Sequence, residues 1–379
     1  MKVLIVDTYY PAFIASIYRT IAGLSSSDYR TQIETLLDQC FGTSDFYSRH
    51  LNAVGVQASD IIVNSVPLQS TWAAAAGRRF MRLSLRIPSR ARRMPLAGHL
   101  FRLFPGLLDI AVEQVQALRP DVLYCQDLSF FPPETLAKLR LKVGIVVGQI
   151  ACPLPPAPFL KGYDLILTSF PHFVPRLRAM GVASEYFRIG FDTRVLELLG
   201  PVKKDIDASF VGGISRHHGK AIPILEYLAK TTPIQFYGYG ARTLDPHSPI
   251  RARHHGEVWG MDMYRALARS RVTLNRHIDV AENNANNMRL YEATGVGTLL
   301  ITDRKDNLHE LFDVGRELLT YSTPREAAEI IQYYLDHPTE AEVIAKAGQA
   351  RTLREHTYRR RMEELVPILE RHLGARHAR

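Results

Sequence analysis

Short apolar runs alternate with amphipathic stretches along the whole chain. Apolar runs of about four to eight residues, bounded by polar residues or glycine, are typical of strands buried on both faces of a parallel sheet. In the first half the pattern predicts strands at 2–7, 61–63, 121–127, 143–148 and 165–168. It predicts helices at 11–24, 43–53, 107–118, 133–139 and 173–180, with 31–37 either a strand or a helix.

The alternation begins again after Gly200-Pro201 and the charged Lys203-Lys204-Asp205. Strands at 208–211, 234–237, 272–275, 298–302 and 317–321 are predicted, and helices at 221–230, 262–269, 286–294, 307–312, 324–335, 339–354 and 358–373. Strands alternating with helices form βαβ units around a parallel sheet. We therefore predict an α/β fold in which two Rossmann-like, doubly wound parallel-sheet domains face a cleft.

Length and composition fit this organisation. A chain of 379 residues is too long for one compact core, so two domains are expected. No apolar run approaches the roughly 20 residues that span a bilayer, and the apolar start at 1–7 is too short for a secretory signal. Cys40, Cys125 and Cys152 are widely spaced without a metal-binding pattern, so we expect a reduced, cytoplasmic compartment.

The net charge of +9 is concentrated in one segment. Residues 61–108 carry no Asp or Glu but eight arginines: Arg78, Arg79, Arg82, Arg86, Arg90, Arg92, Arg93 and Arg102. Apolar residues are interleaved with them, so residues 78–104 are compatible with peripheral contact with an anionic membrane at its inner face. The alternatives are a solvated helix face whose arginine stems cover apolar surface, and a nucleic-acid contact.

Residues 286–303 hold the most informative combination of side chains. Arg289 and Glu292 lie three apart on a predicted helix and therefore share a face. A guanidinium suits a diphosphate, and a carboxylate can accept hydrogen bonds from ribose hydroxyls. The same spacing also occurs in an ordinary surface ion pair, and this segment alone does not decide between the two.

Three other strands of the second half also end in residues suited to a ligand. Glycines allow a close backbone approach to phosphate, and the helix that follows offers its positive end. An aromatic residue can stack on a base, and an asparagine-rich loop can bind sugar hydroxyls or cap a helix. No Walker A or GxGxxG spacing is present. The candidates are Gly212, Gly213, Arg216 and Lys220, then His255, Gly256, Val258 and Trp259, then Asn275 and His277.

Taken in chain order, these strand ends resemble the C-terminal domain of GT-B-fold glycosyltransferases, and most closely the CgeB-like (spore maturation protein-like) branch of the group 1 enzymes. The resemblance covers about residues 205–370. The residues on which it rests are Phe210-Val211-Gly212, Arg216 with Lys220, His255-Gly256, Leu274-Asn275, 288–293, 297–303 and 354–358.

The resemblance implies a metal-independent glycosyltransferase with no cofactor, whose donor is a nucleoside-diphosphate sugar. It implies an acceptor domain at 1–200, a donor domain at 201–356 and a C-terminal helix at 357–379 that crosses back to the first domain. Glu292 would bind ribose, the loop at 256–259 would hold the base, and Gly212-Gly213 would approach the phosphates. The diphosphate would be neutralised by Arg289, Arg216 and Lys220. The acceptor is unknown, and a surface or secondary glycan is the expected product.

The chain also departs from the family pattern. Asn284 stands where many retaining members carry a glutamate eight positions before the ribose glutamate. An inverting enzyme needs a base for the acceptor hydroxyl, and Asp127 and Asp7 are the candidates because they end predicted strands. His50 and His172 are weaker candidates, and Gln149 and His277 could contact sugar or acceptor.

Two other functions remain open from the sequence. A nucleotide-sugar epimerase with the same fold would act on the donor alone. A non-catalytic binder of nucleic acid or another anionic polymer would use the arginine-rich segment 78–102. If the protein is a transferase, no nucleic-acid partner is expected.

Overall fold

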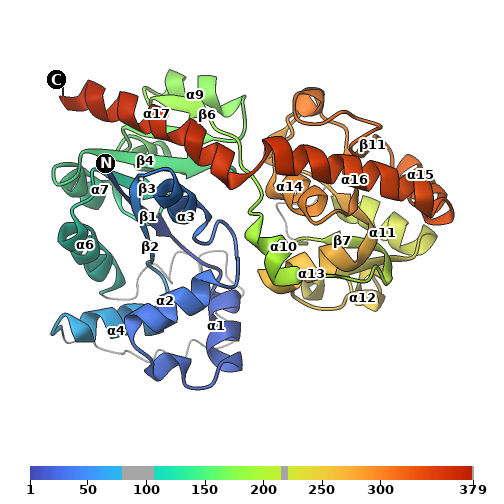
Figure 1. Ribbon diagram of the computed structural model, residues 1–379, viewed down its shortest axis with the longest axis horizontal. Coiled ribbons are helices and arrows are strands. Elements are labelled where there is room, and N and C mark those ends of the chain that lie inside the picture. The colour runs from blue at the N-terminus through green and yellow to red at the C-terminus, as the bar shows by residue number, and fades with distance from the viewer. Residues whose placement is uncertain (79–105, 215–220, 378–379) are drawn as a thin grey trace.

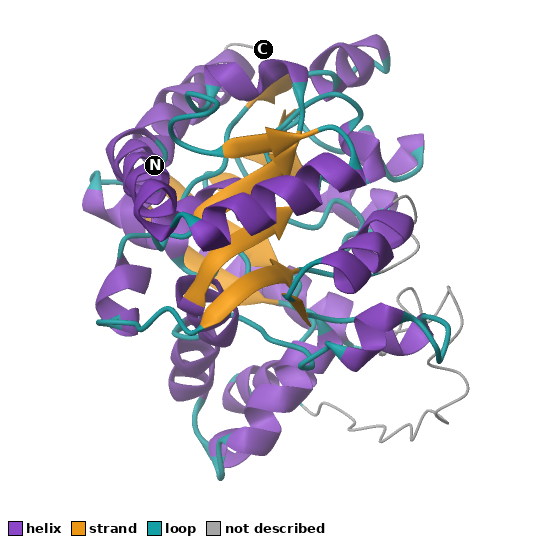
Figure 2. Cartoon of the chain, turned by 90° about the vertical axis from the view of Figure 1, so that its right-hand side faces the viewer, coloured by secondary structure: helices purple, strands orange, loops and turns teal. Residues whose placement is uncertain are grey.

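The computed structural model describes residues 1–78, 106–214 and 221–377, which form two lobes (Figure 1). Each lobe is built on one parallel sheet, with six strands in the first and five in the second. Helices lie on both sides of the strands (Figure 2). The predicted α/β fold with two parallel sheets is therefore confirmed.

The sheet of the first lobe has the order β2-β1-β3-β4-β5-β6. Its strands are β1 (Lys2–Asp7), β2 (Gln57–Ile62), β3 (Val122–Cys125), β4 (Ile145–Ile150), β5 (Leu165–Thr168) and β6 (Ser184–Tyr186). Every residue of β3, β4 and β5 is buried, because helices cover both faces of these central strands. The helices of this lobe are α1 (Pro11–Thr20), α2 (Tyr29–Leu37), α3 (Phe46–Ala53), α4 (Val66–Ala75), α6 (Leu107–Leu118), α7 (Pro133–Arg140), α8 (Ala157–Leu160) and α9 (Phe173–Ala179).

The sheet of the second lobe has the order β11-β10-β9-β7-β8. Its strands are β7 (Ile206–Val211), β8 (Ile234–Tyr237), β9 (Ser270–Asn275), β10 (Leu299–Asp303) and β11 (Leu319–Tyr321). Its helices are α11 (Ile222–Thr231), α12 (Pro249–Ala252), α13 (Met261–Arg269), α14 (Met288–Gly295), α15 (Pro324–Asp336) and α16 (Pro338–Glu355). In both sheets the polar strand ends face the other lobe, where parallel α/β sheets bind their ligands.

The chain crosses between the lobes twice, and the two crossings run side by side. The first leads from β6 to α10 (Arg194–Leu199), and the second leads from α16 to α17 (Tyr358–His377). Phe191 N donates to His356 O at 2.8 Å, and Tyr358 N donates to Phe191 O at 3.0 Å. A Cβ on Gly190 would lie 2.9 Å from His356 O, so the close approach requires glycine there.

α17 returns along the first lobe, where it packs against α3 and β4 (Figure 1). Arg371 and His372 both contact the Glu185 carboxylate at 2.7 Å, and Arg376 Nη1 donates to Asp164 Oδ2 at 2.6 Å. The exact domain limits at residues 200 and 356 stay predictions.

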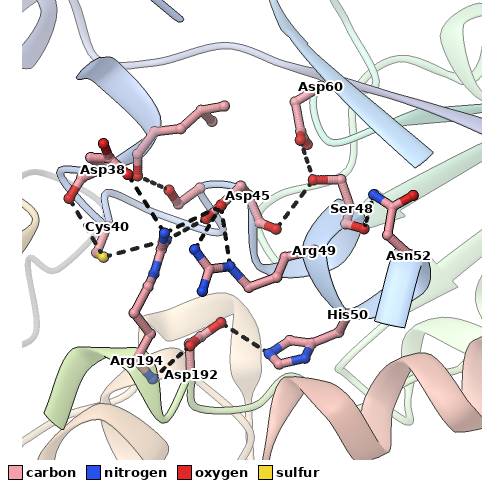
Figure 3. A network of polar contacts seen from close by, with 12 residues as sticks. Asp38, Cys40, Asp45, Ser48, Arg49, His50, Asn52, Asp60, Asp192 and Arg194 are labelled. Carbon is pink, nitrogen blue, oxygen red and sulfur yellow. Dashed lines mark hydrogen bonds and ion pairs between the residues drawn. The ribbon is translucent and has the colours of Figure 1, made fainter. Parts of the chain in front are cut away.

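A polar network fixes the first crossing to α3 and to the loop before it (Figure 3). The Arg194 guanidinium pairs with Asp45 and lies 3.6 Å from Asp38 Oδ1. Asp192 is 1% exposed, and its two carboxylate oxygens accept from Arg194 N at 2.9 Å and contact His50 Nε2 at 3.1 Å. His50 of α3, one of the weaker base candidates, is therefore engaged with the crossing in this structure.

Some local elements differ from the predictions. Residues 31–37 are helical and belong to α2, and the first helix ends at Thr20 rather than residue 24. β6, α4 and α10 were not predicted. β6 and α10 offer too few residues for a clear period, and the ten residues of α4 bury Gln69 and Ser70 beside its apolar residues, which obscures the helical pattern. The predicted helix at 307–312 is a 3-10 helix, Asp306–Glu310.

Most of the arginine-rich segment 78–104 lies outside the described residues, so its predicted membrane contact stays a prediction. Arg78 is described, and its Nη2 lies 2.9 Å from Glu113 Oε1. Among the helices that the structure describes, none combines the length and apolarity needed to cross a membrane.

Asp192→Asn should weaken the fold in a pH-dependent way. Burial opposes ionisation of Asp192, but hydrogen bonds from His50 and Arg194 outweigh it and hold the pKa of this carboxyl below 3.8. Its stabilisation is therefore present above about pH 4 and is lost as the pH falls through the folded-state pKa. We expect the variant to lose about 1.5–3 kcal/mol of unfolding free energy near neutral pH.

Urea denaturation of both proteins between about pH 7 and pH 3 tests this expectation. The two midpoints should converge at the acid end. A difference that is the same at every pH would show that the Asp192 charge does not matter.

Candidate active site

A cavity of about 360 Å³ lies between the lobes, beyond the carboxyl ends of the second sheet. Tyr10, Phe41 and Gly42 line it from the first lobe. Seven of the predicted ligand residues line it from the second lobe: Gly212, Gly213, Val258, Trp259, Asn275, Arg289 and Glu292. The structure thus brings together residues that follow or end three strands, β7, β8 and β9, with two residues of α14.

Arg289 and Glu292 form an ion pair at the cavity wall. Both lie on α14, where Arg289 Nη1 donates to Glu292 Oε2 at 2.6 Å and lies 3.1 Å from Met263 Sδ. Their side chains are 15% and 7% exposed, so the pair is not an ordinary surface ion pair. Burial raises the pKa of Glu292, and the charge of Arg289 opposes this shift. The pair presents a carboxylate and a cation to the same small space.

Asn275 and Asn287 hold the start of α14 against the end of β9. Asn287 Nδ2 donates to Asn275 Oδ1 at 3.0 Å, and Asn275 Nδ2 donates to Thr302 Oγ1 at 2.9 Å. The Asn287 side chain also caps α14 by accepting from Leu290 N. The amide of Asn275 is thus committed to protein partners, and this residue positions the ion pair.

The residue before this cap is held in an unusual backbone conformation. Asn286 has a φ of 139° and is fully buried. Its side chain accepts from Tyr291 Oη at 2.7 Å and donates to Tyr186 Oη at 3.0 Å, while Ser169 Oγ donates to its carbonyl at 3.1 Å. Such strain persists only where the surroundings enforce it, and it concentrates at functional sites. Tyr186 and Ser169 belong to the first lobe, so both lobes fix the entry to α14.

Asn284 contributes to the contact between the lobes. Its Nδ2 lies 2.9 Å from His172 Nδ1, and His172 Nε2 lies 3.1 Å from Val280 O. Burial lowers the pKa of His172, which favours the neutral ring that these contacts require. His172 therefore serves the interface in this structure rather than the cavity.

His277 is buried beneath the site and does not line the cavity. Its Nδ1 lies 2.7 Å from Asp303 Oδ1, and its backbone N donates to the same oxygen at 3.0 Å. Burial opposes ionisation of Asp303, but His277 and the nearby Lys305 outweigh it and hold the pKa of this carboxyl below its usual value. His277 Nε2 is buried and makes no hydrogen bond within the described chain.

Four aromatic rings close one side of the cavity. Tyr239 and Trp259 are stacked with centroids 5.7 Å apart, and Tyr10 from the other lobe meets Trp259 edge-on at 5.4 Å. Phe41 meets Trp259 at 5.7 Å. The Tyr239 ring also covers Gly213, where a Cβ would lie 2.2 Å from Tyr239 Cζ. The ring thus occupies the space beside Gly213 where a side chain would otherwise lie.

His255 and Gly256 face a neighbouring groove of about 1040 Å³ instead. The His255 ring stacks on Tyr237 with a centroid distance of 5.1 Å, and its Nε2 lies 2.6 Å from Gln235 Oε1. Trp259 lines both hollows, so the predicted base-binding loop separates them. Arg216 and Lys220 lie outside the described residues, and their predicted phosphate contacts stay predictions.

Asp7 ends β1, and Asp127 lies two residues beyond the adjacent strand β3, but neither lines the cavity or the groove. Thr8 links them, because its N donates to Asp7 Oδ1 at 2.7 Å and its Oγ1 to Asp127 Oδ2 at 3.2 Å. Burial, reinforced by the Asp127 charge, raises the pKa of Asp7 to about 7. Thr43, beside the cavity residue Gly42, donates to Asp7 Oδ2 at 3.4 Å.

Gln149 is held inside the first lobe. Its Oε1 accepts from Tyr124 Oη at 2.6 Å and from Tyr47 Oη at 2.9 Å, and the residue is buried. These contacts give it a structural role in this structure.

Sequence reasoning missed five residues of this region: Tyr10, Phe41, Tyr239, Arg276 and Asn287. Arg276 directly follows a predicted strand, and Tyr239 stands between two glycines, so their positions offered a signal. Tyr10 and Phe41 reach the site only because the lobes meet, and no local pattern in the sequence reports that contact.

Comparison with known proteins is consistent with this architecture. Residues 218–367 match the family model described as "Glycosyl transferase-like". No curated protein sequence matches the chain significantly.

Solved structures resemble the chain over nearly its whole length. Anabaena HepE in complex with UDP-glucose has a TM-score of 0.56 at 14% identity, covering 98% of this chain and 99% of that one. Sucrose-phosphate synthase from Thermosynechococcus elongatus has a TM-score of 0.57 at 12% identity, covering 99% and 100%. AviGT4, a glycosyltransferase involved in avilamycin A biosynthesis, has a TM-score of 0.56 at 13% identity, covering 99% and 98%. These likenesses show the GT-B fold, and the finer CgeB-like assignment stays a prediction.

Arg289→Met should make stability depend on the ionisation of Glu292. Without its cation, the buried carboxyl has a folded-state pKa raised further above 4.5. The variant should then lose stability as the pH rises above 4.5, by about 1.4 kcal/mol for each unit by which that pKa is raised. Melting temperatures at about pH 5 and pH 8 measure the effect.

The double variant Arg289→Met/Glu292→Gln is the control, because it removes the titrating group. Its deficit should not change between the two pH values. An equal pH dependence in both variants would contradict the assignment to Glu292.

Proposed function

We propose that this protein is a glycosyltransferase that transfers a sugar from a nucleoside-diphosphate sugar to an acceptor hydroxyl without a metal ion. The observation that carries the proposal is the buried Arg289–Glu292 pair, which lines a cavity between the two lobes of a GT-B fold. The glycosyltransferase-like family match over 218–367 and the UDP-glucose complex of HepE support the same reaction class.

The cavity suggests how the donor would bind. Glu292 Oε1 makes no hydrogen bond within the described residues, so it is available to the ribose hydroxyls. Arg289 and the positive end of α14 would face the diphosphate. Val258 and Trp259 would hold the base, with Trp259 offering a ring for stacking.

In the proposed reaction, the bond between the anomeric carbon and the diphosphate oxygen breaks, and a bond to the acceptor oxygen forms. Negative charge grows on the leaving diphosphate during this step. Fixed cations near that oxygen stabilise the transition state more than the ground state and thereby lower the barrier. Of the cations that the sequence predicts for this role, Arg289 lies within the described residues and lines the cavity.

The acceptor proton must go to a base, and Asp7 is our candidate. A base works best when its pKa is near the working pH, and the pKa of Asp7 is raised to about 7. Asp127 would support it electrostatically, because the two carboxyls are linked through Thr8. Thr43 connects Asp7 to the side of the first lobe that lines the cavity.

A thermal-shift panel of UDP, dTDP, GDP, ADP and CMP tests donor binding. We expect at least one nucleoside diphosphate to raise the melting temperature, and Glu292→Ala and Arg289→Ala to abolish the shift. Arg265→Ala is a matched control, because Arg265 pairs with Asp262 on the exposed surface of α13. Polyanions that stabilise the protein while nucleotides do not would favour the polymer binder, and product from donor alone would favour the epimerase.

Asp7→Asn should remove the base without removing the donor site. We expect kcat to fall by about 100- to 10,000-fold while donor affinity is unchanged. In the wild type the rate should rise with pH through about pH 7, because the ionised carboxylate is the active form. Asp60→Asn is the control, since Asp60 is also a buried carboxyl with a pKa raised to about 8, and its side chain accepts a hydrogen bond from Ser48 on α3. Equal losses in both variants would argue against Asp7 as the base.

A further inference from the structure

Arg276 is a second arginine of the cavity, and its guanidinium is incompletely paired. It directly follows β9, its side chain is 15% exposed, and it lines the same cavity as Arg289. Its Nη1 is buried and makes no hydrogen bond within the described chain. Asp279 Oδ1 lies 3.5 Å from that nitrogen, which is close enough for an ion pair but lacks hydrogen-bond geometry.

The two arginines differ in how closely a carboxylate pairs with each guanidinium. Arg289 Nη1 is held by Glu292 at 2.6 Å, so this pair contributes little net charge to the cavity. Arg276 faces a carboxylate at longer range, and that carboxylate is 32% exposed and therefore screened by solvent. A buried N–H without an acceptor is destabilising, so native proteins keep such groups mainly where a ligand or water completes them. Arg276 is thus a cation of the cavity with unused donor capacity.

The backbone places Arg276 beside the start of α14. Asn275 precedes it, and the Asn275–Asn287 amide contacts tie this strand end to the helix cap. The N-terminus of α14 therefore lies next to Arg276, and its positive end favours an anion. Across the cavity, the Tyr239 ring covers Gly213, so the glycine backbone is less available to the same anion.

We propose that Arg276 binds the diphosphate of the donor, an inference that rests on the proposed function. The phosphate oxygens would complete the hydrogen bonding of Nη1 and replace the long contact to Asp279. A guanidinium presents its donors as a fork that matches phosphate oxygens, so the contact is directional as well as charged. Arg276, with Arg289, then holds the leaving group in place.

The test compares UDP with uridine on Arg276→Gln by isothermal titration calorimetry, or the matching pair if the panel selects another base. We expect the Kd for the diphosphate to rise about 10- to 100-fold and the Kd for the nucleoside to stay the same. Arg276→Lys should recover part of the loss, because it restores the charge without the fork. Asp279→Asn should leave diphosphate binding equal or tighter, because it removes the competing carboxylate.

Arg271→Gln is the matched control, since Arg271 lies on the same strand but pairs with Asp207 on the exposed surface. Unchanged diphosphate affinity in Arg276→Gln would overturn the inference and leave the proposed function intact. An equal loss for nucleoside and diphosphate would also overturn it, because it would indicate a structural role. A wild type that binds no nucleoside diphosphate would defeat the proposed function itself.

Discussion

The paired crossings at Phe191 and Thr357 are the constraint on which the rest of the site depends. Two chain segments join the lobes, and backbone hydrogen bonds hold them together. The lobes can therefore rotate about one shared axis more easily than they can slide apart. Arg194 and Asp192 sit directly beyond this pairing, so their contacts to Asp45 and His50 set how the first lobe is oriented against it.

The second lobe then holds its polar groups at a cost to its own stability. Glu292 and Arg289 are largely buried, and a buried ion pair seldom repays its desolvation. Asn286 keeps a backbone angle that few residues adopt, and Arg276 keeps a buried donor that no acceptor among the described residues satisfies. Three costly features within one short stretch of structure are hard to explain by folding alone. They are explained if a ligand with hydroxyls and phosphates completes them.

The sequence predicts the strands well because burial on both faces leaves continuous apolar runs, as at Val122–Cys125 and Leu165–Thr168. It predicts the Arg289–Glu292 pairing because helical spacing is local. It does not predict Tyr10 beside Trp259, because that contact depends on how the lobes meet. It also does not distinguish His277, which is buried beneath the site, from Asn275 and Arg276, which line the cavity. Side-chain direction at a strand end depends on the turn that follows, and residue type does not report that turn.

Asn284 links the interface to the proposed chemistry. Its amide bonds to His172 of the first lobe, so this position helps to hold the lobes together and supplies no carboxylate to the cavity. Glu292 is the acidic residue among the cavity-lining residues that the structure describes, and it is already paired with Arg289. In the proposed reaction a base for the acceptor would come from the first lobe, where Asp7 has a raised pKa and accepts a hydrogen bond from Thr43 beside the cavity. Asp7 lines neither hollow, so a small rotation about the crossings is the simplest movement that would expose it to an acceptor.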